Sequence, residues 1–412
     1  MKMAEASKRK GGKPEIRFKG FDEEWYFCEF KQLVDRKSDI SISSMVEPSV
    51  EYDDIVSGYG ILNKDVRQKE IQKFGISFDV GDILYGKLRP YLKNWLLSNF
   101  SGVAVGDFWV LVPKNCENRC FYYFIQSDSF QKVSNQSTGT KMPRSDWALV
   151  SKATFALPLS CDEQKLIGEI FSNIDTLIIN QQHKYDQLQN LKKAMLEKMF
   201  PRDGADVPEI RFKGFEGAWV QYKVSEITEF HKQGYYTTEP YGVDKKYYLL
   251  RGTDLTENRL ILKDTPKINA TENDYNAFKV EMGDFLIVRS GTVGTYGIVD
   301  CNIPAIFGSY LIDFRFNLSL VTNEFFGYFY QSNRFKSQLN RIIQQSANTN
   351  INAENIKSTC ILLPTIREQQ KIADYFQNLD NLISHQQKKL EHLKHLKAAL
   401  LDKMFVSDGA TA

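Results

Sequence analysis

The sequence predicts an α+β protein in which two tandem-repeated globular domains are separated by a pair of long helices, which form an antiparallel coiled coil with pseudo-twofold symmetry. The octapeptide PEIRFKGF occurs at 14–21 and again at 208–215, and a tryptophan follows each copy, Trp25 and Trp219. Two long segments without proline, 163–200 and 368–405, align with each other without a gap. At 412 residues the chain also exceeds the usual size of a single domain.

The repeat continues through both halves of the chain. The stretches DVGDILYGKLRPY at 79–91 and FIQSDSF at 124–130 match EMGDFLIVRSGTVG at 281–294 and FYQSNRF at 329–335. Internal repeats decide the domain division and are therefore identified first. We expect a disordered tail at 1–13, a first domain at 14–160, a first spacer helix at 161–200, a linker at 201–207, a second domain at 208–364, a second spacer helix at 365–405 and a C-terminal tail at 406–412.

The two kinds of segment have different patterns. In the domain regions, short apolar runs such as DFWVLVP at 107–113 and DFLIVRS at 284–290 are broken by Gly, Asn, Asp and Pro, which indicates many strands. The long segments contain strong helix formers throughout, which predicts one helix each.

Apolar residues recur with a 3,4 spacing in both helical segments, a pattern typical of a coiled-coil seam that neither helix can bury alone. Because only 201–207 separates the first helix from the second domain, the second helix should start near the end of the first, and the pair should be antiparallel. Gln181, Lys184, Gln386 and Lys389 interrupt the seam, either as a solvated gap or as a polar layer that fixes the register. The predicted apolar seam residues are Ile167, Ile170, Ile174, Leu177, Leu188, Leu191, Met195, Ile372, Tyr375, Leu379, Leu382, Leu393, Leu396 and Leu400.

Composition restricts the class of protein. No apolar run approaches the roughly 18 residues of a membrane-spanning helix, and the basic N-terminal stretch is not followed by the apolar stretch of a signal peptide, so we expect a cytoplasmic protein. Six cysteines are irregularly spaced, and Cys116 and Cys120 lack a second pair to complete a zinc site, so we expect free thiols and no metal. The 53 basic and 51 acidic residues nearly balance. Any nucleic-acid contact must therefore depend on local charge or on partners.

The recognisable parts of a catalytic site are missing from the sequence. A self-contained adenine methyltransferase would need a Gly-rich cofactor turn and an Asn/Asp-Pro-Pro-aromatic strip beside the flipped base, yet the chain contains no Pro-Pro. The glycine-rich GTVGTYG at 291–297 matches neither a P-loop nor a dinucleotide-binding turn. His392 and His395 lie on a predicted helix, where they are interpreted as surface polar residues. We predict no catalytic residues.

In order and duplication, these motifs resemble those of the specificity subunits of type I restriction-modification enzymes. The similarity rests on PEIRFKGF, on GDIL and GDFL at 81–84 and 283–286, on STGTKMPR at 137–144 and QQSANTNINAENI at 344–356, and on Leu-Pro, EQ and NxDxLI at each helix start. It covers nearly the whole chain. The resemblance implies that each domain is a target recognition domain for one half of a bipartite, asymmetric DNA sequence, and that the helices set the spacer between the halves.

The resemblance also implies partners. Two methyltransferase subunits would assemble on this scaffold to form an adenine-N6 modification enzyme, and restriction (motor-nuclease) subunits would complete the full complex. S-adenosylmethionine, ATP and Mg are then expected on those subunits, with no cofactor on this chain. The outward helix faces are candidate docking surfaces, including Phe171, Tyr185, Met199, Phe376 and Phe405, although packing against the domains is the alternative for the phenylalanines.

Contacts with DNA require Lys or Arg at phosphates and polar side chains that reach base edges. In the first domain, the loops at 86–94 and 137–147 supply the candidates Lys87, Arg89, Lys93, Thr140, Lys141 and Arg144. In the second, 288–297 and 341–352 supply Arg289, Ser290, Thr292, Arg341, Gln345, Ser346, Asn348 and Asn350. The segments at 36–44 and 233–248, where the copies diverge, are further candidates. Ordinary solvated surface is the competing interpretation for all of them.

Two other functions stay open at this point. One is a self-contained DNA methyltransferase or nuclease with a fused recognition module, and turnover by the purified chain with DNA, Mg²⁺ and S-adenosylmethionine would indicate it. The other is a coiled-coil adaptor without a nucleic-acid role, which absent or salt-insensitive DNA binding by the assembled complex would indicate.

Overall fold

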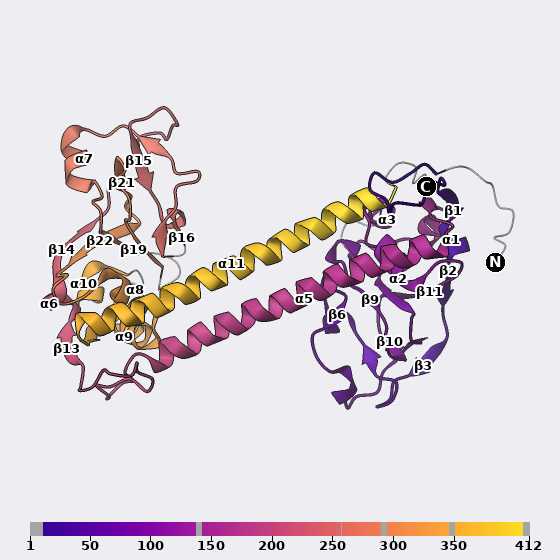
Figure 1. Ribbon diagram of the computed structural model, residues 1–412, viewed down its shortest axis with the longest axis horizontal. Helices are drawn as coiled ribbons and strands as arrows, with labels where there is room; N and C mark the ends of the chain where they lie inside the picture. Colours follow the sequence, from indigo (N-terminus) through magenta and orange to yellow (C-terminus); the bar gives the residue numbers. More distant parts are fainter. Residues whose placement is uncertain (1–10, 137–141, 257, 290–294, 346–350, 407–412) are drawn as a thin grey trace. The chain divides into compact units, whose positions relative to one another are not determined.

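The computed structural model describes residues 11–136, 142–256, 258–289, 295–345 and 351–406, with the backbone alone at 343–345. The chain forms two compact units (Figure 1). Unit 1 comprises Met1–His183 and Lys388–Ala412, and unit 2 comprises Lys184–Gln387. The border falls inside both long helices. Each unit therefore contains one globular domain, the start of one helix and the end of the other, a division that contiguous sequence segments do not reveal.

The first domain contains two four-stranded sheets, with strand orders β3-β7-β10-β4 and β2-β11-β8-β9, and two short pairs, β1-β12 and β5-β6. All of its strand pairs are antiparallel except β10 with β4. The strands are β1 (Tyr26–Glu29), β2 (Val34–Lys37), β3 (Ile40–Ile42), β4 (Ser49–Val50), β5 (Ile55–Val56), β6 (Ile61–Leu62), β7 (Phe74–Phe78), β8 (Ile83–Gly86), β9 (Trp95–Leu97), β10 (Gly102–Ala104), β11 (Phe108–Pro113) and β12 (Thr154–Leu157). The helices are α1 (Phe30–Leu33), α2 (Asn118–Phe124), α3 (Asp128–Ser134), α4 (Trp147–Val150) and the short 3-10 turns η1 (Tyr52–Asp54), η2 (Val66–Gln68) and η3 (Pro90–Leu92).

The second domain has a six-stranded sheet of order β14-β22-β19-β20-β17-β16, a three-stranded sheet β18-β15-β21 and the pair β13-β23. The strands are β13 (Val220–Lys223), β14 (Thr228–Gln233), β15 (Tyr247–Leu250), β16 (Leu255–Thr256), β17 (Arg259–Leu260), β18 (Lys267–Ile268), β19 (Phe285–Val288), β20 (Tyr296–Ile298), β21 (Ala305–Phe307), β22 (Leu311–Phe316) and β23 (Cys360–Leu363). The helices are α6 (Val224–Ile227), α7 (Glu272–Phe278), α8 (Asn323–Gln331), α9 (Asn333–Gln345), α10 (Ala353–Lys357) and the 3-10 turn η4 (Gly252–Asp254).

The two domains repeat one plan. In the first, β8 pairs with β11 so that Leu84 lies opposite Val110, and in the second, β19 pairs with β22 so that Leu286 lies opposite Asp313. In both, the first and last strands of the domain pair with each other, β1 with β12 and β13 with β23. The predicted fold class, α+β with two tandem-repeated domains and a pair of long helices, is confirmed.

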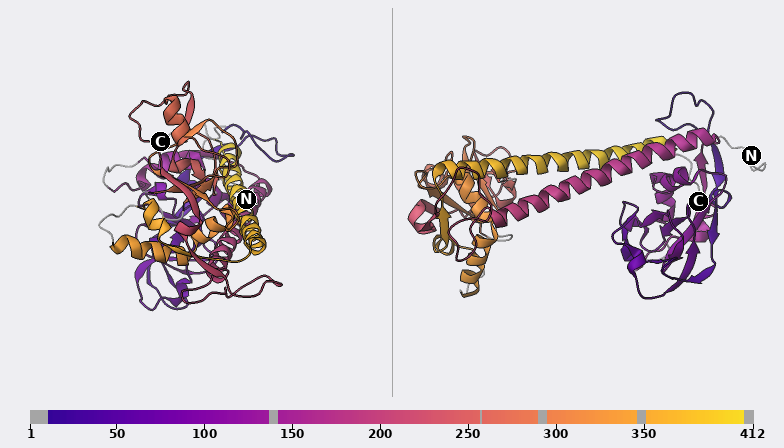
Figure 2. Two further views of the ribbon diagram at one scale, coloured as in Figure 1. Left: turned by 90° about the vertical axis from the view of Figure 1, so that its left-hand side faces the viewer. Right: turned by 60° about the horizontal axis from the view of Figure 1, so that its bottom comes forward.

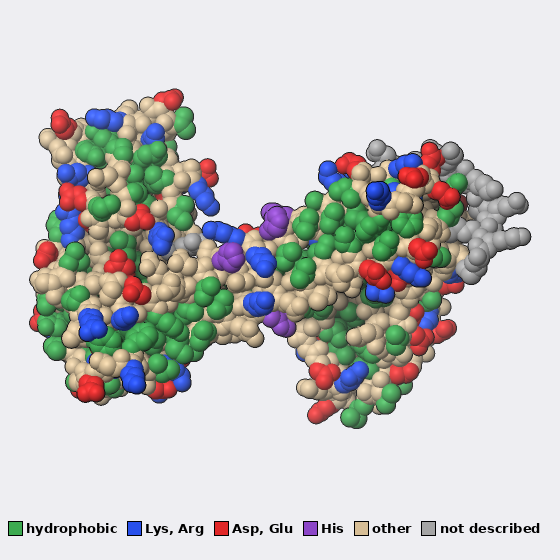
Figure 3. All heavy atoms as spheres, in the orientation of Figure 1, with side chains coloured by type: hydrophobic (Ala, Val, Ile, Leu, Met, Phe, Trp, Pro, Cys, Tyr) green, Lys and Arg blue, Asp and Glu red, His purple; other side chains and the backbone are tan. Residues whose placement is uncertain are grey.

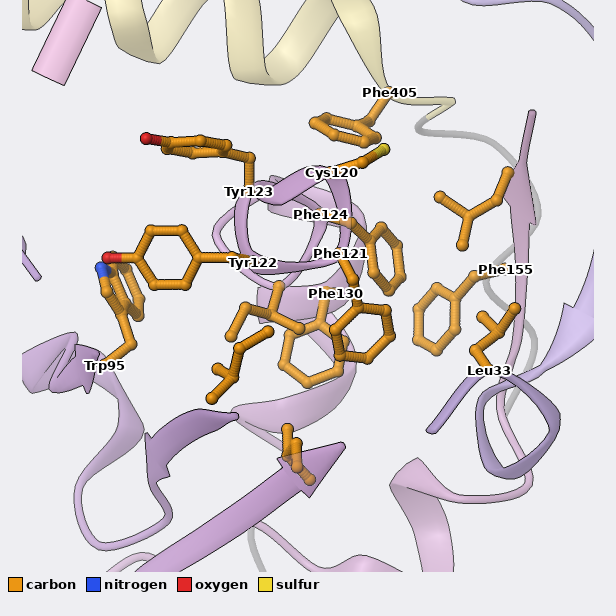
Figure 4. Packing of buried hydrophobic residues seen from close by; sticks show 14 of the residues in the cluster. Leu33, Trp95, Cys120, Phe121, Tyr122, Tyr123, Phe124, Phe130, Phe155 and Phe405 are labelled. Atoms are coloured by element: carbon orange, nitrogen blue, oxygen red, sulfur yellow. The ribbon is translucent and has the colours of Figure 1, made fainter. Parts of the chain in front are cut away.

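Aromatic side chains dominate the core of the first domain. Phe121 and Phe124 on α2 face Phe130 and Phe155, and Phe405, just after the last helix, packs on them (Figure 4). The ring centroids of Phe124 lie 5.1 Å from those of Phe155 and 6.0 Å from those of Phe405. The end of the last helix is therefore part of the core of this domain.

The repeated octapeptide fastens each domain to the helices. Arg17 donates from Nε and Nη2 to the two carboxylate oxygens of Glu163 at 2.6 and 2.9 Å, and Glu163 is only 1% exposed. The backbone N–H of Ile16 donates to the carbonyl of Lys403 at 3.0 Å. In unit 2, Arg211 bonds Glu368 at 2.7 and 2.7 Å, and the N–H of Ile210 donates to the carbonyl of Lys198 at 2.9 Å. The octapeptide thus joins the start of one helix to the end of the other, which explains why it occurs once in each half.

The two long helices are α5 (Cys161–Lys198) and α11 (Ile366–Met404). A Cβ at Gly168 of α5 would come within 2.8 Å of the Cβ of Arg119 on α2, so glycine allows the two helices to approach closely there. In unit 1 the first part of α5 runs beside the last part of α11 (Figures 1 and 2). No helix in the described part of the chain is both long and apolar enough to span a membrane.

Contacts inside each unit show that the helices run antiparallel. In unit 1, Phe171 stacks on Phe405 at 6.1 Å, and Asp175 pairs with Lys397 at 2.7 Å. In unit 2, Phe200 stacks on Phe376 at 6.3 Å, and Lys192 pairs with Asp380 at 2.6 Å. In both units a higher number on α5 meets a lower number on α11, as expected for antiparallel helices.

One of the two predicted seam stripes is wrong at its four leucines, while its members Ile170 and Tyr375 are half-buried against the domain cores. Leu177, Leu191, Leu382 and Leu396 are 54, 39, 48 and 41% exposed. The buried residues lie one position later, at Phe171, Ile178, Met199, Phe376, Leu390 and Met404. In the other predicted stripe, Ile167, Ile174, Ile372 and Leu379 are buried, and Leu188, Met195, Leu393 and Leu400 are half-buried. Apolar residues occupy both neighbouring positions, so the pattern alone did not distinguish them, and the domains decide the choice by packing on the Phe171 and Phe376 side.

Exposure decides between the alternatives that the sequence left open for two features of the helices. Phe171, Met199, Phe376 and Phe405 are at most 3% exposed, so they belong to the cores and cannot form a docking surface. Tyr185 is half-buried. Lys184 and Lys389 are exposed, as in the solvated gap, whereas Gln181 is buried and Gln386 is half-buried. The lysines that enter the helix interface are Lys192 and Lys397, which were not predicted there.

The predicted disordered tail at 1–13 extends too far, because its last residues, 11–13, are part of the described structure. The N–H of Gly11 donates to the carbonyl of Trp25 at 2.7 Å, and the N–H of Trp25 donates to the carbonyl of Gly12 at 3.0 Å. In unit 2, the N–H of Trp219 likewise donates to the carbonyl of Asp206, at 2.8 Å. Val406, at the start of the predicted C-terminal tail, packs on the core of the first domain. Residues 1–10 and 407–412 lie outside the described part of the chain.

Candidate nucleic-acid interface

Two predicted DNA-contacting loops of the first domain lie side by side. The N–H of Arg89 donates to the carbonyl of Pro143 at 2.7 Å, and the N–H of Ser145 donates to the carbonyl of Lys87 at 2.9 Å. Leu88 and Arg144 form an antiparallel bridge between the same segments. Lys87, Arg89 and Arg144, which are separated in sequence, therefore belong to one surface.

The loop that follows β8 has an unusual backbone. Arg89 and Lys93 both adopt the left-handed region, with φ of 47° and 56°, on either side of η3. Each such non-glycine residue costs about 1–3 kcal/mol and persists where the surrounding structure imposes it, often at binding sites. Both side chains are exposed. The strained turn holds two cations at the surface.

Asp107 organises the charge of this surface. Its carboxylate accepts from Arg144 Nη2 at 3.0 Å and lies 3.7 Å from Lys87 Nζ. The hydrogen bond that Arg144 donates to Asp107 raises the pKa of the Arg144 guanidinium. Two cations beside one carboxylate leave a local positive excess, which suits phosphate oxygens.

The second domain repeats this arrangement with different side chains. The N–H of Arg289 donates to the carbonyl of Tyr310 at 3.0 Å, as Lys87 donates to that of Asp107 at 2.9 Å. The carbonyl of Arg289 accepts from the N–H of Ile351 at 3.2 Å, as Lys87 does from Ser145. Tyr310 is 67% exposed. An arginine and an exposed tyrosine thus occupy the positions that a lysine and an aspartate hold in the first domain.

The other predicted residues are placed differently or not described. Arg341, on α9, is exposed and pairs with Asp203 of the linker at 2.7 Å. Gln345 ends α9, but its side chain is not described. Thr140, Lys141, Ser290, Thr292, Ser346, Asn348 and Asn350 lie outside the described residues.

The divergent segments present large apolar side chains to solvent. Ile40 on β3 is 77% exposed, and Phe74 on the paired strand β7 is 73% exposed. In the second domain, Tyr236 and Tyr241 are 76 and 62% exposed. The divergence of the two copies marked the segments of Ile40, Tyr236 and Tyr241 but not that of Phe74, and their exposure could not be read from the sequence, since apolar strand residues are usually buried.

Each domain also has a cavity next to the helices. In unit 2 a cavity of about 420 Å³ is lined by Lys192, Asn258, Arg259, Tyr328 and Asp380, among others. In unit 1 a cavity of about 320 Å³ is lined by Tyr59, Lys93, Trp95, Asp175 and Lys397, among others.

Charge elsewhere is mixed, with Lys and Arg interspersed among Asp and Glu on the visible face of each unit (Figure 3). All six cysteines, which lie in the described ranges, are free thiols.

The family described as type I restriction modification DNA specificity domain matches residues 57–190 and 216–395, in both halves of the chain. The chain belongs to this family.

Individual members are distant in sequence. The specificity subunit of the type I restriction enzyme MjaVIII from Methanocaldococcus jannaschii is 22% identical over 368 residues, which cover 86% of this chain and 83% of that protein. The specificity subunit of the type I restriction enzyme EcoDI from Escherichia coli is 20% identical over 183 residues, 43% of this chain and 41% of that protein.

Solved structures of the family share the fold. A crystal structure of the S subunit of a type I restriction-modification system from M. genitalium matches 95% of this chain and 99% of its own, with a TM-score of 0.63 and 13% identity. A chain from a structural study of complex assembly and conformational transition in the type I R-M system matches 93% of this chain and 98% of its own, with a TM-score of 0.57 and 18% identity. In this chain, the paired loops around Lys87 and Arg289 occupy equivalent places in the two domains.

Proposed function

We propose that this chain is the non-catalytic DNA-specificity subunit of a type I restriction-modification system, and that each of its domains reads one half of a bipartite, asymmetric target. One observation carries the proposal. The contacts that join domain to helices are duplicated, as in Arg17–Glu163 and Arg211–Glu368, whereas the loop surfaces differ. Two equal attachments with unlike contact surfaces suit two unlike half-sites.

The loop surfaces supply the DNA contacts. Lys87, Arg89, Lys93 and Arg144 bind phosphate oxygens or guanine edges in the first half-site, and Arg289 has the equivalent role in the second. Asp107 holds the two cations beside it and can accept from the amino group of cytosine. The exchange of Asp107 for Tyr310 between the copies supports different sequence preferences for the two domains.

The rest of the activity is assigned to partners. Two methyltransferase subunits and the restriction subunits assemble with this chain, and S-adenosylmethionine, ATP and Mg²⁺ bind to them. The complex acts on DNA in the cytoplasm. The nearly balanced charge of the chain, 53 basic against 51 acidic residues, supports a dependence on partners for DNA affinity, since phosphate binding by itself requires a basic excess.

Reconstitution tests the proposal. The chain is combined with its modification subunits, and methylated adenines are mapped on genomic DNA. We expect a single bipartite sequence, no turnover by the chain alone, and weak DNA binding that tightens with the modification subunits. Turnover by the isolated chain would favour a self-contained enzyme. Absent or salt-insensitive binding by the complex would favour an adaptor without a DNA role.

A further inference from the structure

Unit 1 contains a carboxylate that is bound from two other elements at once. Asp175, on α5, accepts from the hydroxyl of Tyr123 on α2 at 3.0 Å and from Nζ of Lys397 on α11 at 2.7 Å. Lys397 is 9% exposed, donates to Oε1 of Gln126 at 2.9 Å, and lies 5.3 Å from the centre of the Tyr123 ring. We call Asp175, Tyr123 and Lys397 the first polar tie.

Unit 2 contains the same arrangement with the helices exchanged. Asp380, on α11, accepts from the hydroxyl of Tyr328 on α8 at 3.0 Å and from Nζ of Lys192 on α5 at 2.6 Å. Lys192 lies 5.7 Å from the centre of the Tyr328 ring, and Asn258 adds a hydrogen bond to Asp380 at 3.2 Å. We call Asp380, Tyr328 and Lys192 the second polar tie. Each tie joins a domain, the start of one helix and the end of the other.

The apolar seam alone does not determine the helix register. Apolar residues recur every seven positions along both helices, so within the seam itself a slip of one heptad still brings apolar side chains together, although it breaks the octapeptide contacts and takes Phe405 out of the core of the first domain. The polar ties do not survive such a slip. Asp175 would face Leu390 or Met404 in place of Lys397, and Lys397 would lose its carboxylate. An unpaired charge in an apolar interface is strongly unfavourable, so the slipped registers are disfavoured.

The two ties are compatible with one register only. Asp175 and Lys192 are separated on α5 by the same number of residues as Asp380 and Lys397 on α11. In an antiparallel pair, equal stretches allow both ties to form at once. The equality follows from the duplication, and it turns two separate ion pairs into one constraint on the whole helix pair.

We propose that the two polar ties fix the register of α5 against α11 and thereby set the number of base pairs between the two half-sites, an inference that rests on the proposed function. Asp175 and Asp380 are positioning residues in this account. They need not touch DNA, but they determine which spacer the complex accepts. The apolar seam provides the association, and the ties select its alignment together with the octapeptide contacts and the packing of Phe405 on Phe171.

The test uses a tie-free variant that keeps the helices apolar. It carries Asp175→Leu, Asp380→Leu, Lys192→Met, Lys397→Met, Tyr123→Phe and Tyr328→Phe, and its methylated sites are mapped in the complex with the modification subunits. We expect unchanged half-sites with more than one spacer, the additional one offset by about 3 base pairs, because one heptad is about 10 Å of helix and one base-pair step is about 3.4 Å. A single wild-type spacer in the folded, active variant would overturn the proposal.

Two controls isolate the ties. Asp162→Asn with Lys165→Met removes an exposed ion pair of α5, which has side chains 83 and 61% exposed, and should leave one spacer. Asp175→Lys with Lys397→Asp reverses the first pair but retains it, and should also keep one spacer. If the tie-free variant fails to fold, this reversed pair decides, because a mixture of spacers there would contradict a role for the pairing.

A second readout does not need methylation. His183→Cys and His392→Cys place one exposed thiol on each helix within unit 1, and a short thiol crosslinker joins them, with the product identified by peptide mass spectrometry. The yield should fall when the tie-free substitutions are added. An unchanged yield would overturn the proposal. Absence of any bipartite methylation by the wild-type complex would instead contradict the proposed function, while the crosslinking result would still stand.

Discussion

Replacing the buried carboxyl of Asp313 by valine should stabilise unit 2, most strongly at alkaline pH. Asp313 lies on β22, is 0% exposed, and has no hydrogen-bond partner for either carboxylate oxygen among the described residues. Arg315 comes no closer than 3.9 Å, and it is bound more tightly by Asp284 at 2.7 Å and by Glu281 at 3.0 Å. Val110, at the equivalent position of the first domain, is also fully buried, so the site accepts valine.

The size of the stability change follows from the pKa of the Asp313 carboxyl. Burial, and then the neighbouring Asp284 carboxylate, raises the pKa of Asp313 to about 8, whereas an unfolded aspartate titrates near 3.9. Between these values the folded state holds a proton that the unfolded state has lost, so stability decreases as the pH rises. At about 1.4 kcal/mol per pH unit, the loss between pH 4 and pH 7 is about 4 kcal/mol. The Asp313→Val variant removes this loss.

Calorimetric unfolding from pH 5 to pH 9 measures the effect. The wild-type transition of unit 2 should move to lower temperature as the pH rises, and the variant should show a flatter profile with the largest gain above pH 7. Asp82→Val provides the contrast, because Asp82 accepts from Lys37 Nζ at 2.6 Å and from the N–H of Asp79 at 2.7 Å, and its loss should destabilise unit 1. Parallel pH profiles for wild type and Asp313→Val would refute the reasoning.

Three further predictions test other parts of the account. Arg17→Ala leaves the buried Glu163 without its guanidinium and should destabilise unit 1 by about 3 kcal/mol in denaturant titrations; a loss within error of zero would show that the octapeptide is not needed for attachment. Phe171→Ala should lower the free energy of unfolding by about 3–4 kcal/mol, whereas Leu177→Ala, on the exposed stripe, should lower it by less than about 1 kcal/mol. The reverse order would support the stripe that was predicted from the sequence. Lys87→Ala should weaken DNA binding at the first half-site, and Arg289→Ala should weaken it at the second. In titrations of the assembled complex, each variant should lower the slope of log binding constant against log salt concentration by about 1. Equal effects of either variant on both half-sites would argue against separate reading domains.

The sequence was sufficient for the fold class and the antiparallel pair because both depend on repetition and connectivity. The octapeptide signalled two equivalent attachments, and the short linker determined the helix direction. Which apolar stripe is buried could not be derived, because Leu177 and Ile178 are adjacent and equally apolar. Only the aromatic residues of each domain, such as Tyr123 beside Phe171 at 5.1 Å, settle that choice.

The candidate DNA surface was partly accessible from sequence. Lys87, Arg89 and Arg144 were found as cations in turn-rich loops, and the structure brings these loops together. Asp107 was missed because a single acidic residue before a strand does not indicate a DNA contact in the sequence. Its role becomes visible only when the loop of Arg144 is placed beside it. Lys192 and Lys397 were missed because a lysine in a helical repeat is ordinarily solvated, and their aspartate partners lie on the other helix.

Shortening both helices tests the central claim most directly, that two duplicated domains read the half-sites while the paired helices set the spacer. Deleting 180–186 and 385–391 removes one heptad from each stretch between Asp and Lys and preserves both polar ties. Mapping of methylated adenines should then show both half-sites unchanged, with the spacer shortened by about 3 base pairs. Deletion from one helix alone should abolish a defined target, because the two stretches become unequal. An unchanged spacer, or an altered half-site, in the double deletion would contradict the account.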